Sequence, residues 1–162
     1  MLSKKMLKAL NDQVNAELYS HYLYLAMAAH CEAENLSGFA HWLKAQSYEE
    51  YGHGLKIFGY IQQRGSRVSL KAIEEPPAKW ASPLAVVEDV AKHERLVTSK
   101  VNDLVDLAIA EKDHATLAFL QWFVTEQVEE EATADALVQK LKLVRDTPSG
   151  LFMVDRELAA RQ

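Results

Sequence analysis

The 162-residue sequence contains one cysteine, four prolines and six glycines. A single cysteine, Cys31, excludes an internal disulfide and a thiolate metal cluster, and it fits a reducing compartment. The N-terminus has no signal-peptide core, and the longest apolar run, Tyr22 to Ala29, is too short to span a bilayer. These absences predict a soluble cytoplasmic protein.

The chain also lacks an excess of positive charge. Its 18 Lys and Arg against 23 Asp and Glu give a formal net charge of −5. Nucleic acids and acidic membrane surfaces attract basic proteins, so we expect neither as a partner. With 49% hydrophobic residues, the chain is long enough for a sizeable core, and we expect one domain over 1–162.

Helix-breaking residues are confined to a few places. Neither glycine nor proline occurs before Gly38 or between Pro83 and Pro148, and such stretches, rich in Ala, Leu, Glu and Lys, favour long helices. The expected elements are helices at about 4–33, 38–64, 83–111 and 114–144, an extended crossover at about 66–81, and a short fifth helix from Thr147-Pro148 to about 160. The predicted fold class is all-α, a four-helix bundle with one long crossover between its second and third helices.

Each long helix carries a stripe of residues at 3-4 spacing that would face a common core. The stripes are apolar except near their middles, where acidic or amide side chains interrupt them. They consist of Leu10, Val14, Glu17, His21, Tyr24 and Ala28; Phe39, Leu43, Gln46, Glu50, His53, Ile57 and Tyr60; Val87, Val90, Glu94, Val97, Val101, Leu104 and Ala108; and Thr116, Leu120, Phe123, Gln127, Glu130, Ala134, Leu137 and Leu141.

The polar interruptions repeat along the chain. Glu17 and Glu50 are 33 residues apart (50 − 17), as are Glu94 and Gln127 (127 − 94), and the two pairs are offset by 77 (94 − 17). The same offset relates His53 to Glu130 and Glu49 to Glu126. Two similar helical hairpins would therefore bring matching polar residues to one level of the bundle.

Several glutamates at one level of an apolar core need a positive partner. A buried unpaired carboxylate costs several kcal/mol or stays protonated, and the stripes contain no Lys or Arg. Oxygen-rich ligands with one imidazole suit iron, manganese or zinc, and enough carboxylates are present to bridge two metals. The Glu-x-x-His spacing favours iron, as in dinuclear bundle proteins. The predicted ligands are Glu17, Glu50, His53, Glu94, Gln127 and Glu130.

Taken singly, these residues have ordinary explanations, and only their combination indicates a dinuclear site. Glu49-Glu50 alone would be a solvated helix face, and His53 alone a core histidine. We expect His21 to pack beside the site and the Tyr24 hydroxyl to reach a ligand carboxylate. The remaining histidines and two tryptophans are expected on the surface, the tryptophans as subunit contacts: His30, His41, His93, His114, Trp42 and Trp80.

The sequence resembles the ferritins, most of all the bacterial and archaeal non-haem type, from Leu2 to Gln162. The resemblance lies in "NAELYSHYLYLAM", "YEEYGHG", "KHE", "FLQWFVTEQVEEEA" and "LFMVDRELAARQ". It implies that the first-site and bridging ferroxidase ligands are Glu17, Glu50, His53 and Glu94, and that Glu94 and Glu130 hold a second iron beside Gln127. It further implies that a third iron is held by Glu49, Glu126, Glu129 and Glu130. By the same resemblance, Tyr24 is the family's tyrosine near the centre of the site.

The function implied by the resemblance is Fe(II) oxidation by oxygen or hydrogen peroxide and storage of ferric oxyhydroxide in a 24-subunit shell. No haem is expected, because Tyr51 stands where bacterioferritins have the haem-ligating methionine, and because the fourth helix lacks a second Glu-x-x-His. A non-catalytic metal-buffering or structural bundle protein remains the alternative.

Overall fold

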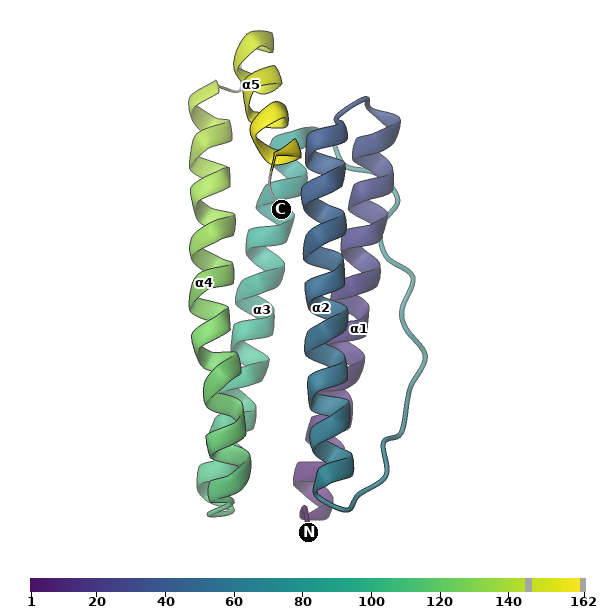
Figure 1. The fold of residues 1–162 in the computed structure, drawn as a ribbon, viewed down its shortest axis with the longest axis vertical. Coiled ribbons are helices and arrows are strands. Elements are labelled where there is room, and N and C mark those ends of the chain that lie inside the picture. The colour runs from purple at the N-terminus through teal and green to yellow at the C-terminus, as the bar shows by residue number, and fades with distance from the viewer. Residues whose placement is uncertain (145–146, 161–162) are drawn as a thin grey trace.

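The computed structural model of the chain describes residues 1–144 and 147–160. Within these ranges there are five helices and no strand: α1 (Lys4–Ala33), α2 (Ser37–Gln63), α3 (Pro83–Ala110), α4 (His114–Val144) and α5 (Pro148–Ala159). Helices α1 to α4 form an elongated bundle, and the crossover between α2 and α3 runs along the outside of the α1–α2 pair (Figure 1). The predicted all-α bundle with one long crossover and a short fifth helix is confirmed.

Side-chain caps start two of the long helices where the sequence indicates. The Ser3 Oγ accepts a hydrogen bond from the Met6 N–H at 2.9 Å, and the Ser82 Oγ accepts one from the Ala85 N–H at 3.1 Å. Thr147 differs, because its hydroxyl donates to the Val144 carbonyl at 2.9 Å and makes no capping bond to α5.

Helix α2 is capped by a residue from α5. Leu36, at its N-cap position, offers no side-chain acceptor. Instead the Asp155 Oδ1 accepts hydrogen bonds from the Gly38 N–H at 2.9 Å and the Phe39 N–H at 3.0 Å. The free N–H groups and positive dipole end of α2 are thereby satisfied by a carboxylate more than a hundred residues away in sequence.

The core consists of two apolar clusters at different levels of the bundle. One includes Phe39, Trp42 and Val154 and extends under α5, and the other includes Met6, Leu10 and Ile57. Every residue of the four predicted stripes is buried except His21, which is half-buried. The stripe prediction therefore locates the core.

Two surface expectations are wrong. Trp42 is 1% exposed, because it belongs to the cluster that α5 covers. His93 lies beside Tyr19 and Tyr24, and its Nε2 is 2.7 Å from the Ser20 Oγ, so burial lowers the pKa of its imidazole to about 4.

Trp80 is half-buried and its Nε1 donates to the Asp89 Oδ2 at 2.9 Å. None of the helices in the described ranges is both long and apolar enough to cross a lipid bilayer.

Candidate metal centre

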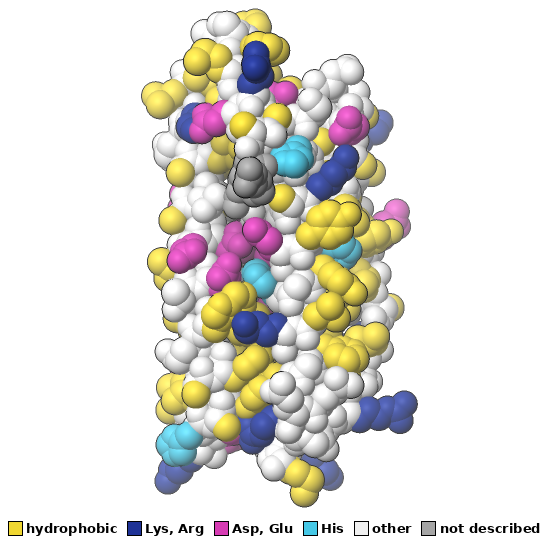
Figure 2. Space-filling view, viewed as in Figure 1, with side chains coloured by type: hydrophobic (Ala, Val, Ile, Leu, Met, Phe, Trp, Pro, Cys, Tyr) yellow, Lys and Arg dark blue, Asp and Glu magenta, His cyan; other side chains and the backbone are white. Residues whose placement is uncertain are grey.

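The polar layer lies between the two apolar clusters and draws on all four long helices. Glu17, Glu50 and Glu94 are no more than 1% exposed, and Gln127, His53 and Glu130 are no more than 7% exposed. Helix α1 contributes Glu17, and α2 contributes Glu50 and His53. Helix α3 contributes Glu94, and α4 contributes Gln127 and Glu130. Acidic side chains with a histidine among them are visible at mid-height over α4 and α2 (Figure 2).

Glu17, Glu50 and His53 form the first group. One ligand atom from each lies within 4.8 Å of the others, and the His53 Nδ1 is 3.4 Å from the Glu50 Oε1. Both oxygens of Glu50 and the Oε2 of Glu17 are buried without a hydrogen-bond partner. This group therefore offers unoccupied acceptors of the kind that a cation fills.

His53 also belongs to a second group, with Glu126 and Glu130. One ligand atom from each again lies within 4.8 Å of the others, and the His53 Nε2 is 4.0 Å from the Glu126 Oε1. The imidazole thus stands between the carboxylates of α2 and those of α4. Its ring also contacts Trp122 and Phe123, with centroids 5.3 Å and 6.1 Å away.

Glu94 is already held by two donors. The Tyr24 hydroxyl donates to its Oε1, which is the contact expected for this tyrosine, and the Gln127 Nε2 lies 3.2 Å from its Oε2. Gln127 also donates to the Thr98 Oγ1 at 3.2 Å, and the Thr98 hydroxyl donates to the Glu131 Oε1 at 2.5 Å. The orientation of the Gln127 amide is therefore set by its hydrogen bonds to Glu94 and Thr98.

The remaining residues of the expected third iron site lie further out. Glu126 is half-buried and joins the His53–Glu130 group, whereas Glu49 and Glu129 are exposed. In the part of the chain that the structure describes, neither Glu49 nor Glu129 belongs to a metal-binding group of this kind. Burial is the main reason why the pKa values of Glu50 and Glu130 are raised, and the negative charge of Glu49 adds a smaller contribution to both.

The buried carboxyl groups all hold their protons more tightly than usual. Burial, and then the charge of Glu50, raises the pKa of Glu17 well above its ordinary value. Burial, and then the charge of Glu94, raises the pKa of Glu50 well above its ordinary value and that of Glu130 to about 7. Burial likewise raises the pKa of Glu94. A cation that replaces these protons would relieve both the desolvation and the repulsion.

Two buried glutamines next to the site were not predicted as part of it. The Gln13 Nε2 donates to the Glu17 Oε1 at 2.8 Å, and the Gln46 Nε2 donates to the Glu130 Oε2 at 2.8 Å. Each glutamine precedes a glutamate by four residues, one helical turn on the same face, and the two are again 33 residues apart (46 − 13). That repeated spacing was the available signal.

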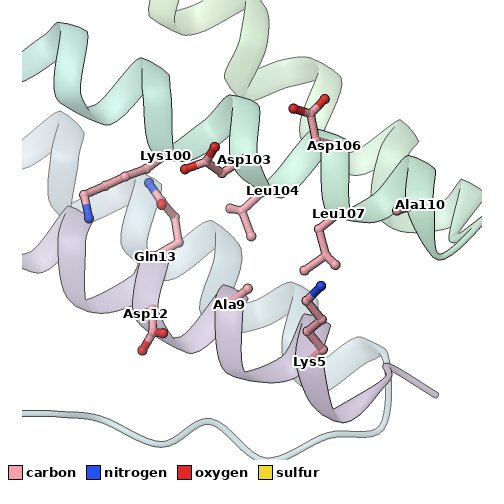
Figure 3. A pocket seen from close by; sticks show the side chains of 10 residues that line it. All are labelled: Lys5, Ala9, Asp12, Gln13, Lys100, Asp103, Leu104, Asp106, Leu107 and Ala110. Carbon is pink, nitrogen blue, oxygen red and sulfur yellow. The ribbon is translucent and has the colours of Figure 1, made fainter.

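A separate cavity of about 480 Å³ lies between α1 and α3. Figure 3 shows Lys100, Gln13 and Asp103 at one part of it, and Lys5 beside Leu107 at another. Gln13, one of its lining residues, also donates to the predicted ligand Glu17. The cavity is therefore next to the predicted metal ligands through Gln13, but none of those ligands lines it.

Comparison with known proteins agrees with this geometry. Residues 7–144 match the family model described as a ferritin-like domain. A bacterial non-heme ferritin of Bacteroides fragilis is 48% identical over 161 residues, which are 99% of this chain and 100% of that protein. One of Staphylococcus epidermidis is 42% identical, covering 99% of this chain and 97% of that protein. A crystal structure of an open-pore ferritin from the hyperthermophilic archaeon Archaeoglobus fulgidus covers 100% of both chains at 49% identity, with a TM-score of 0.99. The chain belongs to the ferritin family.

Proposed function

We propose that the chain is the subunit of an iron-storage protein, which oxidises Fe(II) in the polar layer and stores the ferric product inside a shell of identical subunits. The observation that carries the proposal is the pair of carboxylate groups that share His53, one with Glu17 and Glu50 and the other with Glu126 and Glu130. Carboxylate oxygens with one imidazole bind iron in dinuclear bundle proteins.

In this reaction Fe(II) is the substrate. Glu17, Glu50 and His53 bind one ion, and Glu94 and Glu130 bind a second beside Gln127. Each Fe(II) loses one electron, and O₂ takes up both electrons and two protons to form hydrogen peroxide. Hydrogen peroxide as oxidant would instead take two electrons and two protons to form two waters. Carboxylates favour the product because their negative charge stabilises Fe(III) more than Fe(II).

Two features assign roles to the surrounding residues. The Tyr24 hydrogen bond fixes the orientation of Glu94, which would bridge the two ions. Glu126, together with the more exposed Glu49 and Glu129, would hold a third ion and conduct ferric product away from the layer. A site that only held metal for structure would not need these outer carboxylates.

We also propose that identical subunits cover the apolar side chains that a single subunit exposes. Tyr22, Tyr48 and Tyr51 are 48%, 68% and 43% exposed, and apolar side chains gather on the α2 side of the view in Figure 2. A contiguous apolar patch of this kind is typical of an interface. The family resemblance suggests a shell of 24 subunits.

Cys31, buried with its pKa raised to about 11, is an unreactive thiol suited to the cytoplasm.

Aerobic addition of Fe(II) to the purified assembly tests the function. We expect the ferric absorbance to rise far faster than in buffer, iron to remain with the protein, and light scattering to give the mass of a large assembly. Replacing two ligands together, Glu17→Ala with Glu130→Ala, should return oxidation to the buffer rate.

Glu32→Ala is the matched control, since Glu32 is exposed and its Oε2 lies 3.5 Å from the Lys44 Nζ on the surface. Metal binding without accelerated oxidation would contradict ferroxidase activity and support the metal-buffering alternative.

A further inference from the structure

Gln46 is a buried amide that reaches across the bundle to the polar layer. It lies on α2, is 1% exposed, and donates from its Nε2 to the Glu130 Oε2 on α4 at 2.8 Å. Gln13, its counterpart one helical turn before Glu17, donates to the glutamate of its own helix. Gln46 instead leaves its own neighbour, Glu50, without a donor.

The amide oxygen of Gln46 has no partner. In the described ranges, the buried side-chain oxygens and nitrogens that lack a hydrogen bond belong to three residues only: Glu17, Glu50 and Gln46. Leaving such an acceptor buried and unpaired is destabilising, so an apolar side chain would make a more stable core there. The other two residues are predicted metal ligands, for which a cation is the missing partner.

The position of this oxygen follows from the contact that the nitrogen makes. Both atoms are bonded to the same carbon, so the Oε1 must also lie close to the Glu130 carboxylate. Turning the amide over would place an oxygen against a carboxylate oxygen, which is unfavourable unless a cation lies between them.

We propose that Gln46 is a further ligand of the metal centre, whose amide oxygen binds the cation held by Glu130. This inference rests on the metal site proposed above. Amide oxygens are suitable ligands for hard cations. A neutral ligand also suits this position, because the four carboxylates of Glu17, Glu50, Glu94 and Glu130 already repel one another, and a fifth charge would add to that repulsion.

Binding of Zn²⁺ to the metal-free protein, followed by isothermal titration calorimetry, tests the proposal without any redox step. Gln46→Leu removes both amide atoms and should weaken one of the Zn²⁺-binding steps about tenfold or more, leaving the other unchanged. Gln46→Glu keeps an oxygen at the position, loses the N–H donors and adds a negative charge that bound Zn²⁺ offsets, so it should bind Zn²⁺ at least as tightly as the wild type. Gln46→Met repeats the apolar test with a more adaptable side chain if leucine does not pack.

The matched control is Gln62→Leu, the same change at an exposed position of α2. Wild-type affinity in both Gln46→Leu and Gln46→Met would overturn the proposal. Equal losses in Gln46→Leu and Gln46→Glu would also overturn it, because they would show that Gln46 acts only by donating to Glu130. If the wild-type protein bound no Zn²⁺, the metal site itself would be refuted along with its extra ligand.

Discussion

At the scale of single residues, hydrogen-bond donors are shared unevenly among the buried carboxylates. The Glu94 carboxylate accepts hydrogen bonds from Tyr24 and Gln127, whereas neither oxygen of Glu50 accepts a hydrogen bond. An incoming cation meets free acceptors at Glu50 but must compete with existing donors at Glu94. The two proposed metal positions are therefore expected to differ in affinity, and the side chains that hold the donors should matter as much as the ligands.

Thr98 is one such side chain. Its hydroxyl has a single proton, which it gives to Glu131, so its oxygen can only accept from the Gln127 amide. Thr98→Val should leave that amide held by Glu94 alone and slow Fe(II) oxidation severalfold, with a stability loss of about 1 kcal/mol. Initial oxidation rates and melting temperatures measure the two effects.

Thr98→Ser keeps the hydroxyl and serves as the control, for which we expect near wild-type rates. If valine and serine gave the same rate, the hydroxyl would have no role in orienting Gln127.

At the scale of helices, α5 is fastened to the start of α2 by a close backbone approach as well as by Asp155. A Cβ added to Gly38 would lie 1.7 Å from the Asp155 carbonyl oxygen, so no other residue fits without moving α5. Glycine is therefore required at this helix end for space. Elsewhere in α2 the situation differs, since a Cβ at Gly52 would meet nothing within 4 Å in the subunit.

This contrast gives a paired prediction within one helix. Gly38→Ala should destabilise the protein by about 1–3 kcal/mol, because it displaces α5 and weakens the cap. Gly52→Ala should stabilise the subunit by about 0.5–1 kcal/mol, because glycine costs that much in a helix interior. Urea denaturation of both variants checks the signs.

A loss of stability or of assembly in Gly52→Ala would show that a neighbouring subunit approaches that glycine. Gly54→Ala tests the side facing α1, where a Cβ would lie 3.4 Å from the Glu17 Cβ, an ordinary contact that we expect to be nearly neutral.

The helices and the ligand stripe could be predicted because their signals are local. The Ser82-Pro83 start, the break before Gly38 and the 3-4 spacing around Glu50 depend on neighbours in sequence, and all agree with the structure. Pairings across the bundle could not be predicted in this way. Nothing near Gln46 indicates that its donor goes to Glu130, and the burial of Trp42 depends on the placement of α5.

At the scale of the whole molecule, a polar layer lies between two apolar clusters of the bundle, and the negative charge of its buried carboxylates has to be neutralised. Without metal, the layer can do so only by keeping protons. The pKa of Glu130 is about 7 in the folded chain against an ordinary value of 4.5, and those of Glu17, Glu50 and Glu94 are also raised.

The metal-free protein should therefore lose stability as the pH rises. Between about pH 4.5 and pH 7 the unfolded chain releases the Glu130 proton while the folded chain retains it, which costs on the order of 3 kcal/mol by the upper end. Asp113, whose pKa is lowered to about 2 by Arg64 and Thr116 against the opposing effect of burial, contributes its stability throughout this range. Urea midpoints at fixed protein concentration, at about pH 5 and pH 7.5, measure the change.

Saturating Zn²⁺ should reverse the trend, since the cation binds the ionised carboxylates of the folded state only. Glu130→Gln removes one titrating group and should reduce the pH dependence of the metal-free protein. A metal-free protein that is more stable at the higher pH would contradict the proposed protonation of the layer.

The crossover between α2 and α3 is the only covalent connection between two hairpins that each contribute half of the polar layer. On the side of the first hairpin it is tied to α1, where the Ser69 N–H donates to the Asn11 Oδ1 and the Asn15 side chain donates to the Ala72 carbonyl. A break after these contacts, near Pro76, would leave two peptides with complementary apolar stripes and unpaired glutamates on each. If the polar layer binds metal as proposed, the bound ion would then hold two separate peptides together, and their association would rise when the ion is added and fall when a chelator removes it.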